Sequence, residues 1–101
     1  MTIDDLVPLV EQWASDRGIL DHSTPTAQLL KTVSELGELA DATAKGDVIG
    51  VMDGVGDVLV TLILYARLAN LSISGCLEHA YGQIKDRKGK MSAGGVFVKE
   101  S

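Results

Sequence analysis

Apolar residues recur every three or four positions through most of the chain, which is the spacing of amphipathic helices. The pattern predicts helices at about residues 2–17, 25–45, 50–70 and 74–88. The chain ends in MSAGGVFVKES, where two adjacent glycines and a short alternating run replace the helical spacing. Residues 89–101 are therefore expected to form a loop or a small extended arm.

Local signals place some of these boundaries. Thr24 can cap the second helix, with Pro25 in the first helical position, where no backbone N–H is needed. The third helix begins somewhere between Asp47 and Asp53, in a stretch with glycines at positions 50, 54 and 56. Each glycine costs about 1 kcal/mol relative to alanine inside a helix. These glycines mark either a close approach of a phosphate or a neighbouring helix, or a frayed helix start.

Four helices joined by short connections predict an all-α fold resembling a four-helix bundle. The third helix is apolar on nearly every side from Val58 to Ala66, so it needs neighbours all around it. A chain of 101 residues provides few such neighbours by itself. We therefore expect a single domain that assembles as a homodimer or a dimer of dimers.

Charge and composition narrow the possible partners and location. The net charge is −5, which argues against a general nucleic-acid-binding surface. Cys76 is the single cysteine, so no internal disulfide can form. The N-terminus carries Asp4 and Asp5 where a signal peptide would be basic, and the apolar run 58–64 is too short to span a membrane. A cytoplasmic protein without a membrane partner is expected.

Four carboxylates lie at the edge of the predicted core. Glu35 and Glu38 share one face of the second helix, and Asp53 and Asp57 stand one turn apart if the third helix has formed by residue 53. Such like-charged pairs persist in a core only if something positive lies between them. Oxygen ligands without histidine or cysteine favour Mg²⁺ or Mn²⁺. The pattern fits a metal site and a solvated surface cluster about equally well.

Two long stretches also resemble a known family. QLLKTVSELGELADATAKGD and DGVGDVLVTLILYARLANLSISGCLEHAYGQIKDRKGKM are similar to the MazG-like members of the all-α nucleoside triphosphate pyrophosphohydrolases, over about residues 26–98. The family pattern is ExxE on one helix and ExxD on the next. The resemblance implies Mg²⁺-dependent hydrolysis of an NTP or dNTP to the monophosphate and pyrophosphate, for nucleotide-pool control or house-cleaning. Short relatives occur in bacteria and phages, so the cytoplasm can be that of a phage host.

Position by position, Glu35 and Glu38 match the ExxE, and Asp57 matches the last residue of the ExxD. The position three before Asp57 is Gly54, which departs from the pattern and leaves the number of metal ions open. Asp53, one residue earlier, can still project from the same helix face. The resemblance implies that these four carboxylates hold metal. Either a glutamate, with Glu38 preferred, or Asp53 would activate the water.

Further residues are candidates for binding the substrate. They are Trp13, Gln28, Lys31, Lys85, Asp86, Arg87 and Lys88. The last four, with Lys90, lie where the resemblance places a basic patch, although basic residues also favour helix ends. Lys31 shares a face with the ExxE, where it can contact phosphate or simply pair with Glu35. Trp13 can stack on the base or belong to the core.

Two non-hydrolytic hypotheses remain open at this point. One is a non-catalytic helical module that dimerises or binds a partner, with a degenerate metal site; the Gly54 departure favours it. The other keeps the fold and only binds a nucleotide. Metal-dependent release of pyrophosphate separates both from the hydrolase.

Overall fold

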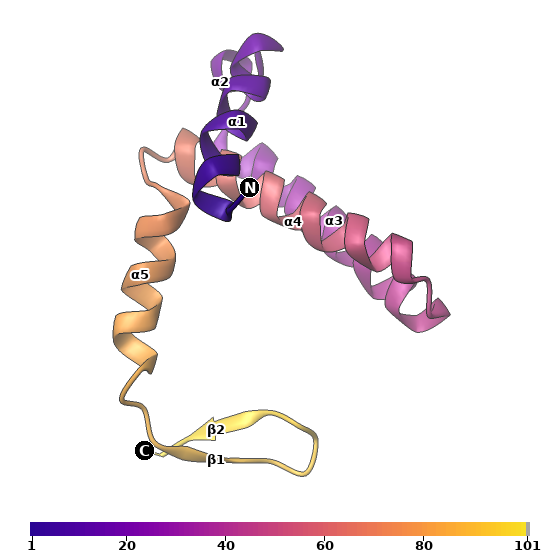
Figure 1. Cartoon of the computed structure of the whole chain (residues 1–101), viewed down its shortest axis with the longest axis vertical. Coiled ribbons are helices and arrows are strands. Elements are labelled where there is room, and N and C mark those ends of the chain that lie inside the picture. Colours follow the sequence, from indigo (N-terminus) through magenta and orange to yellow (C-terminus); the bar gives the residue numbers. More distant parts are fainter. Residues whose placement is uncertain (101) are drawn as a thin grey trace.

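Five helices and one short hairpin make up the described residues, 1–100, of this computed structural model (Figure 1). The elements are α1 (Ile3–Asp16), α2 (Ile19–His22), α3 (Pro25–Lys45), α4 (Val48–Leu68), α5 (Ile73–Ile84), β1 (Gly89–Met91) and β2 (Phe97–Lys99). The predominantly helical fold predicted from the sequence is confirmed. Two details differ: α2 forms where a loop was expected, and α5 ends at Ile84 rather than near residue 88.

The helix ends follow from local capping. The Thr24 hydroxyl accepts a hydrogen bond from the N–H of Ala27 at 3.1 Å and caps α3. Gly46 ends α3 in the left-handed region, with φ of 68°, which favours glycine. Asp47 then caps α4 through the N–H of Gly50 at 3.0 Å. Because only two residues separate α3 from α4, the two helices form an antiparallel hairpin.

The α3–α4 pair contains most of the small core. Its buried residues are Thr32, Glu35, Ala42, Gly54, Thr61, Ile63, Leu64 and Ala66, and α1 adds Ala14 where it packs on α4. Helix α4 begins at Val48, so its glycines lie inside a regular helix. The frayed start considered from the sequence is therefore wrong.

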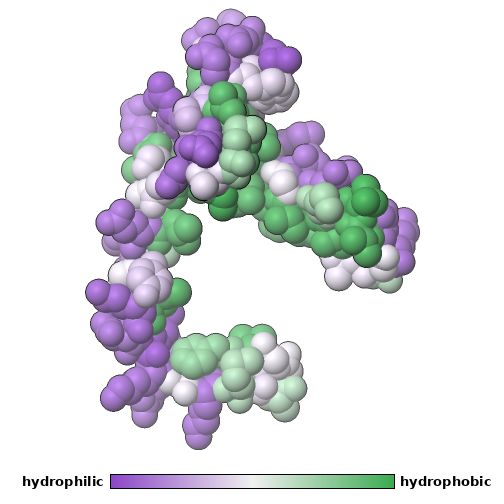
Figure 2. Space-filling view, viewed as in Figure 1, coloured by the Kyte–Doolittle hydropathy of each residue, from purple (hydrophilic) through white to green (hydrophobic). Residues whose placement is uncertain are grey.

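Helix α5 and the hairpin extend away from this pair (Figure 1). The strands are antiparallel, with Met91 opposite Phe97, and every residue in them is exposed. The four-helix bundle-like fold expected from the sequence is not closed within one chain, because α5 leaves the α3–α4 pair after contacting α4. Many apolar side chains consequently remain uncovered over the α3–α4 pair and the hairpin (Figure 2).

Helix α4 is, within residues 1–100, the one helix with the length and composition that would allow it to cross a membrane. The sequence expectation considered only the run 58–64, whereas the helix continues over 21 residues. In the structure α4 packs along α3 and carries Asp53 and Asp57 in its first half. This pairing gives α4 a place in the core of the helical hairpin.

Candidate metal and nucleotide site

Glu35 is a buried carboxylate with an unsatisfied oxygen. The residue is 7% exposed and lies on the face of α3 that packs against α4. Its Oε1 is 3.4 Å from Nζ of Lys31, whose side chain is largely exposed. Its Oε2 has no hydrogen-bond partner among residues 1–100. A buried ionised oxygen is costly unless something pairs with it, so this atom marks a position where a positive group or donor would be stabilised.

Glu38 lies one turn further along α3 and is exposed. The pKa of Glu38 is raised above its ordinary 4.5, first because its protonated carboxyl can hydrogen-bond to Glu35 and next because ionised Glu35 repels its charge. Partial desolvation and Asp57 raise this pKa further, while Lys31 opposes the shift. Glu35, Glu38 and Asp57 therefore act on one another across the α3–α4 pair.

Carboxylates line an open hollow of about 250 Å³ at the end of the pair where α3 turns into α4. The acidic lining residues are Glu38, Asp41, Asp47, Asp53 and Asp57. Lys45 is the basic residue in the lining, and its Nζ is already paired with Asp41 at 2.8 Å. The hollow thus has an excess of negative charge and oxygen donors only, which is the chemistry that Mg²⁺ and Mn²⁺ prefer.

These side chains do not yet converge on a single point. In the described part of the chain, no group of three or more Asp, Glu, His or Cys side chains is gathered closely enough to hold an ion. Glu38, Asp53 and Asp57 are all exposed and free to change rotamer. With the unsatisfied Oε2 of Glu35 beside them, the donor set fits a divalent cation.

Position 54, where the ExxD pattern has glutamate and this chain has glycine, lies where α4 packs closely on α3. A Cβ added at Gly54 would stand 3.0 Å from Cβ and 3.1 Å from Cα of Leu39 on α3. A side chain at this position would require Leu39 to move by a few tenths of an ångström, and Gly54 and Asp53 both line the hollow. The close-approach interpretation of this glycine is therefore correct.

Two other candidates, Gln28 near the start of α3 and Trp13 on α1, are outside the residues that line the acidic hollow. The amide of Gln28 donates to the Ser23 hydroxyl at 3.0 Å. Trp13 is 44% exposed, and the guanidinium of Arg17 lies 4.7 Å from its ring centre. Trp13 is thus neither a core residue nor a fully free stacking surface.

The basic segment is not brought to the carboxylates within one chain. Lys85 caps the C-terminus of α5. Asp86, Arg87 and Lys88 line a separate hollow of about 470 Å³ with residues of the hairpin. The end of α5 lies well away from the α3–α4 pair in Figure 1. The expected phosphate-binding cations and the expected metal ligands are therefore apart in a single copy.

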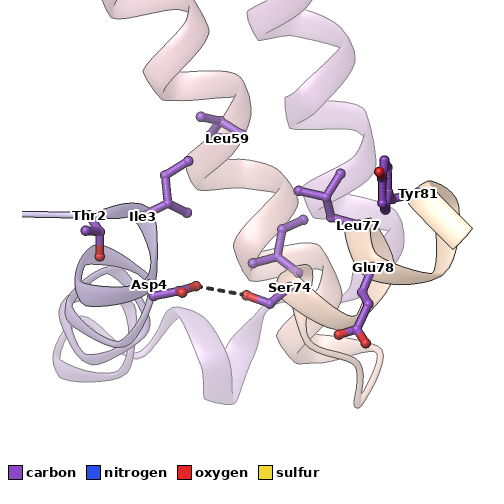
Figure 3. A pocket seen from close by; sticks show the side chains of 9 residues that line it. Thr2, Ile3, Asp4, Leu59, Ser74, Leu77, Glu78 and Tyr81 are labelled. Carbon is purple, nitrogen blue, oxygen red and sulfur yellow. Dashed lines mark hydrogen bonds between the residues drawn. The ribbon is translucent and has the colours of Figure 1, made fainter. Parts of the chain in front are cut away.

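A third hollow, of about 620 Å³, is mainly apolar (Figure 3). It lies where α1, α4 and α5 meet, and Ile3, Leu59, Leu77 and Tyr81 provide much of its lining. The Ser74 hydroxyl and Asp4 carboxylate bridge α5 and α1 at 3.4 Å. Its apolar character indicates a packing surface rather than a reaction site.

Comparisons with known proteins agree with this arrangement. A solved cyanophage S-2L MazG-like pyrophosphohydrolase, bound to dGDP and three catalytic Mn²⁺ ions per active site, matches with a TM-score of 0.76 over 100% of this chain and 95% of its own. The two sequences are 18% identical, so this match shows the fold.

A sequence relative comes from Haemophilus phage HP1 (strain HP1c1), where it is described as an uncharacterised 18.2 kDa protein in the rep-hol intergenic region. It is 35% identical over 65 residues, which are 64% of this chain and 40% of the relative. The present chain thus matches about two fifths of that protein. Residues 23–91 match the family described as the MazG nucleotide pyrophosphohydrolase domain. Because this match includes both carboxylate-bearing helices, the chain belongs to the MazG nucleotide pyrophosphohydrolase domain family.

Proposed function

We propose that this protein hydrolyses a nucleoside triphosphate, NTP or dNTP, to the monophosphate and pyrophosphate. The observation that carries the proposal is the buried Glu35, whose Oε2 lacks a partner among residues 1–100, next to Glu38 with its raised pKa. Family membership supports the same chemistry. The cyanophage structure supports a nucleotide ligand and a divalent metal, since it contains dGDP and Mn²⁺.

The residues that would hold Mg²⁺ or Mn²⁺ are Glu35, Glu38, Asp53 and Asp57. A bound divalent ion would neutralise phosphate charge and make a coordinated water more acidic. In the overall reaction, the oxygen of water forms a new P–O bond, one bond of the α,β-phosphate bridge breaks, and a proton is released. Glu38 is the preferred acceptor of that proton, because it is an exposed carboxylate that lines the hollow, with Glu35 and Asp53 as the alternatives.

We further propose that two or more copies associate. A compact protein of 10.7 kDa exposes about 5,500 Å², whereas this chain exposes 7512 Å², an excess of about 2,000 Å². Its radius of gyration is 16.0 Å, against about 13 Å for a compact domain of 100 residues. The excess area matches what one protomer buries in a large, permanent interface. The apolar surface over the α3–α4 pair and the hairpin is the surface to be covered.

Association also offers a role for the basic segment. Residues 85–101 carry five basic and two acidic side chains, a net charge of +3, whereas residues 1–84 carry four basic and twelve acidic ones, −8. The acidic hollow of one copy and the basic arm of another are therefore complementary. We propose that Lys85, Arg87 and Lys88 bind phosphate at a partner's carboxylates. Mixed dimers of Asp57→Ala and Lys85→Ala chains should then regain activity, and failure to do so would count against this sharing.

The proposal extends to the cellular location and the biological purpose of the protein. The single cysteine, Cys76, fits a reducing compartment, and we propose a cytoplasmic location, which is the host cytoplasm for a phage-encoded protein. Clearing damaged nucleotides or trimming a dNTP pool are the purposes that fit a small pyrophosphohydrolase.

The decisive experiment measures pyrophosphate release from the common NTPs and dNTPs, with Mg²⁺, with Mn²⁺ and with EDTA. Wild type is compared with Glu38→Ala and with Asp21→Asn, which alters an exposed carboxylate on α2 outside the hollow. We expect metal-dependent release that Asp21→Asn retains and Glu38→Ala loses. A folded, metal-supplied wild type that releases no pyrophosphate from any triphosphate would favour the non-catalytic module.

A further inference from the structure

The register of α3 against α4 is marked by two contacts, which lie on either side of Glu35, Glu38 and Asp57. On one side, the hydroxyls of Thr32 and Thr61 lie 2.8 Å apart. On the other side, Leu39 lies against Gly54. Thr32 is three residues before Glu35 and Thr61 is four after Asp57, so the hydroxyl pair lies one helical turn from the carboxylates.

The threonine pair is buried and directional. Thr32 and Thr61 are 4% and 5% exposed. Within residues 1–100, theirs is the one side-chain hydrogen bond that joins α3 to α4. Besides this bond, the described contacts between these helices are the charge interactions of Glu35, Glu38 and Asp57 and the packing of residues such as Leu39 on Gly54, which depend less steeply on angle. A buried hydrogen bond, by contrast, weakens steeply with distance and angle.

Each hydroxyl also has a partner in its own helix. Thr32 Oγ1 lies 2.9 Å from the carbonyl oxygen of Gln28, and Thr61 Oγ1 lies 2.9 Å from that of Val58. If either threonine loses its hydroxyl, the other can still donate to its own backbone carbonyl. Neither donor is then left buried without an acceptor. This bond therefore contributes little to the free energy of unfolding. Its main effect is to fix the position of α3 relative to α4.

We propose that the hydrogen bond between Thr32 and Thr61 is a positioning contact for the carboxylate site. It holds α3 and α4 in the register at which Glu35 and Glu38 face Asp57. Neither threonine touches the substrate or the metal; both act through the helices that carry the ligands. This inference rests on the proposed function, because the site that it positions is the proposed metal and nucleotide site.

The test compares Thr61→Val with wild type, Thr61→Ser and Ile63→Val. Valine keeps the shape of threonine and removes its hydroxyl, serine keeps the hydroxyl, and Ile63→Val trims a buried residue of α4 without touching the hydrogen bond. Mn²⁺ affinity is measured by titration calorimetry, thermal unfolding by circular dichroism, and kcat and KM with the preferred triphosphate. The calorimetric readout does not depend on turnover.

We expect Thr61→Val to weaken Mn²⁺ binding about tenfold, the size typical for groups that orient metal ligands. Thr61→Ser should bind Mn²⁺ as wild type does. Ile63→Val should lower the unfolding temperature at least as much as Thr61→Val while leaving Mn²⁺ affinity unchanged. Thr32→Val should reproduce Thr61→Val, and the double variant should be no worse than either, because both changes remove one bond.

Two outcomes would overturn this inference, and they have different meanings. If wild type binds Mn²⁺ and Thr61→Val binds it equally well, the threonines are structural only and the proposed function stands. If wild type neither binds Mn²⁺ nor hydrolyses any triphosphate, the proposed function is wrong and the positioning role falls with it. Loss of folding in Thr61→Val shifts the comparison to Thr32→Val, which removes the same bond from the other helix.

Discussion

Gly54 of α4 lies against Leu39 of α3 so closely that a Cβ at position 54 would stand 3.0 Å from the Cβ of Leu39. The absent side chain lets the two carboxylate-bearing helices approach one another. Any side chain in this position, including the glutamate of ExxD, would require Leu39 to move by a few tenths of an ångström. Glycine at this position therefore favours close packing of the two helices, and Asp53 is the neighbouring carboxylate of α4 that lines the hollow.

Replacing Gly54 with alanine should destabilise the protein. Alanine is favoured over glycine in a helix by about 1 kcal/mol, but overpacking against a neighbouring backbone costs about 1–3 kcal/mol. We expect a net loss of about 1 kcal/mol in the free energy of unfolding, measured by urea denaturation. Gly56→Ala is the matched control, since a Cβ at Gly56 meets nothing within 4 Å among the described residues. If Gly54→Ala stabilises the folded protein as much as Gly56→Ala does, the packing argument is wrong.

Metal-free stability should fall as the pH rises above 4.5, through the ionisation of Glu38. The folded-state pKa of Glu38 is raised, so between 4.5 and that pKa the folded protein binds more protons than the unfolded chain. Stability is then lost with rising pH and fully lost above the folded pKa. Unfolding temperatures of wild type and Glu38→Gln across this window provide the measurement. The unfolding temperature of wild type should fall relative to that of Glu38→Gln as the pH rises through this window. A difference that stays constant with pH would argue against a raised pKa of Glu38.

Glu35→Gln should return the pKa of Glu38 towards its ordinary value. Glu35 is the main cause of the shift, through both hydrogen bonding and repulsion, so a neutral amide removes most of it. Carboxyl chemical shifts followed by NMR during a pH titration measure this pKa directly. Asp47→Asn, a change in the same hollow outside the causes of the shift, should leave the pKa in place. An unchanged pKa in Glu35→Gln would mean that the two carboxyls are not neighbours in solution.

Divalent metal should stabilise the folded protein, and EDTA should reverse the effect. An ion that binds only the folded state at 100 times its Kd adds about 2.7 kcal/mol. We expect Mn²⁺ to raise the unfolding temperature of wild type and to have little effect on Asp57→Asn, which lacks one proposed ligand. A rise of the same size in both proteins would show that the stabilising ion binds elsewhere.

The helices could be predicted from sequence because their signals are local. Thr24 and Pro25 start α3, and Gly46 ends it, where the sequence pattern placed these boundaries. The four carboxylates were also found as candidates, since spacing alone puts Glu35 near Glu38 and Asp53 near Asp57. Whether they form one metal site stays a prediction.

Contacts between residues that are far apart in the sequence could not be predicted in this way. The contact of Gly54 with Leu39 depends on how deeply two helices interlock, which neither helix encodes alone. The Thr32–Thr61 bond was missed because both are ordinary helical threonines; their matching positions along an antiparallel hairpin were the available signal. The sequence did not predict that α5 extends away from the α3–α4 pair. An apolar helix face predicts burial, but it does not indicate whether the same chain or another one covers that face.

The two-residue connection between α3 and α4 has a consequence for the order of folding. Contacts between neighbouring helices close short loops, so they form quickly and at a rate independent of protein concentration. An isolated two-stranded hairpin has little stability of its own, and the arm beyond α5 buries almost nothing within its chain. We expect a fast unimolecular phase that assembles the carboxylate-bearing helices, followed by a bimolecular phase that orders the arm. The protein would thus bring its proposed metal ligands together before it finds its partner.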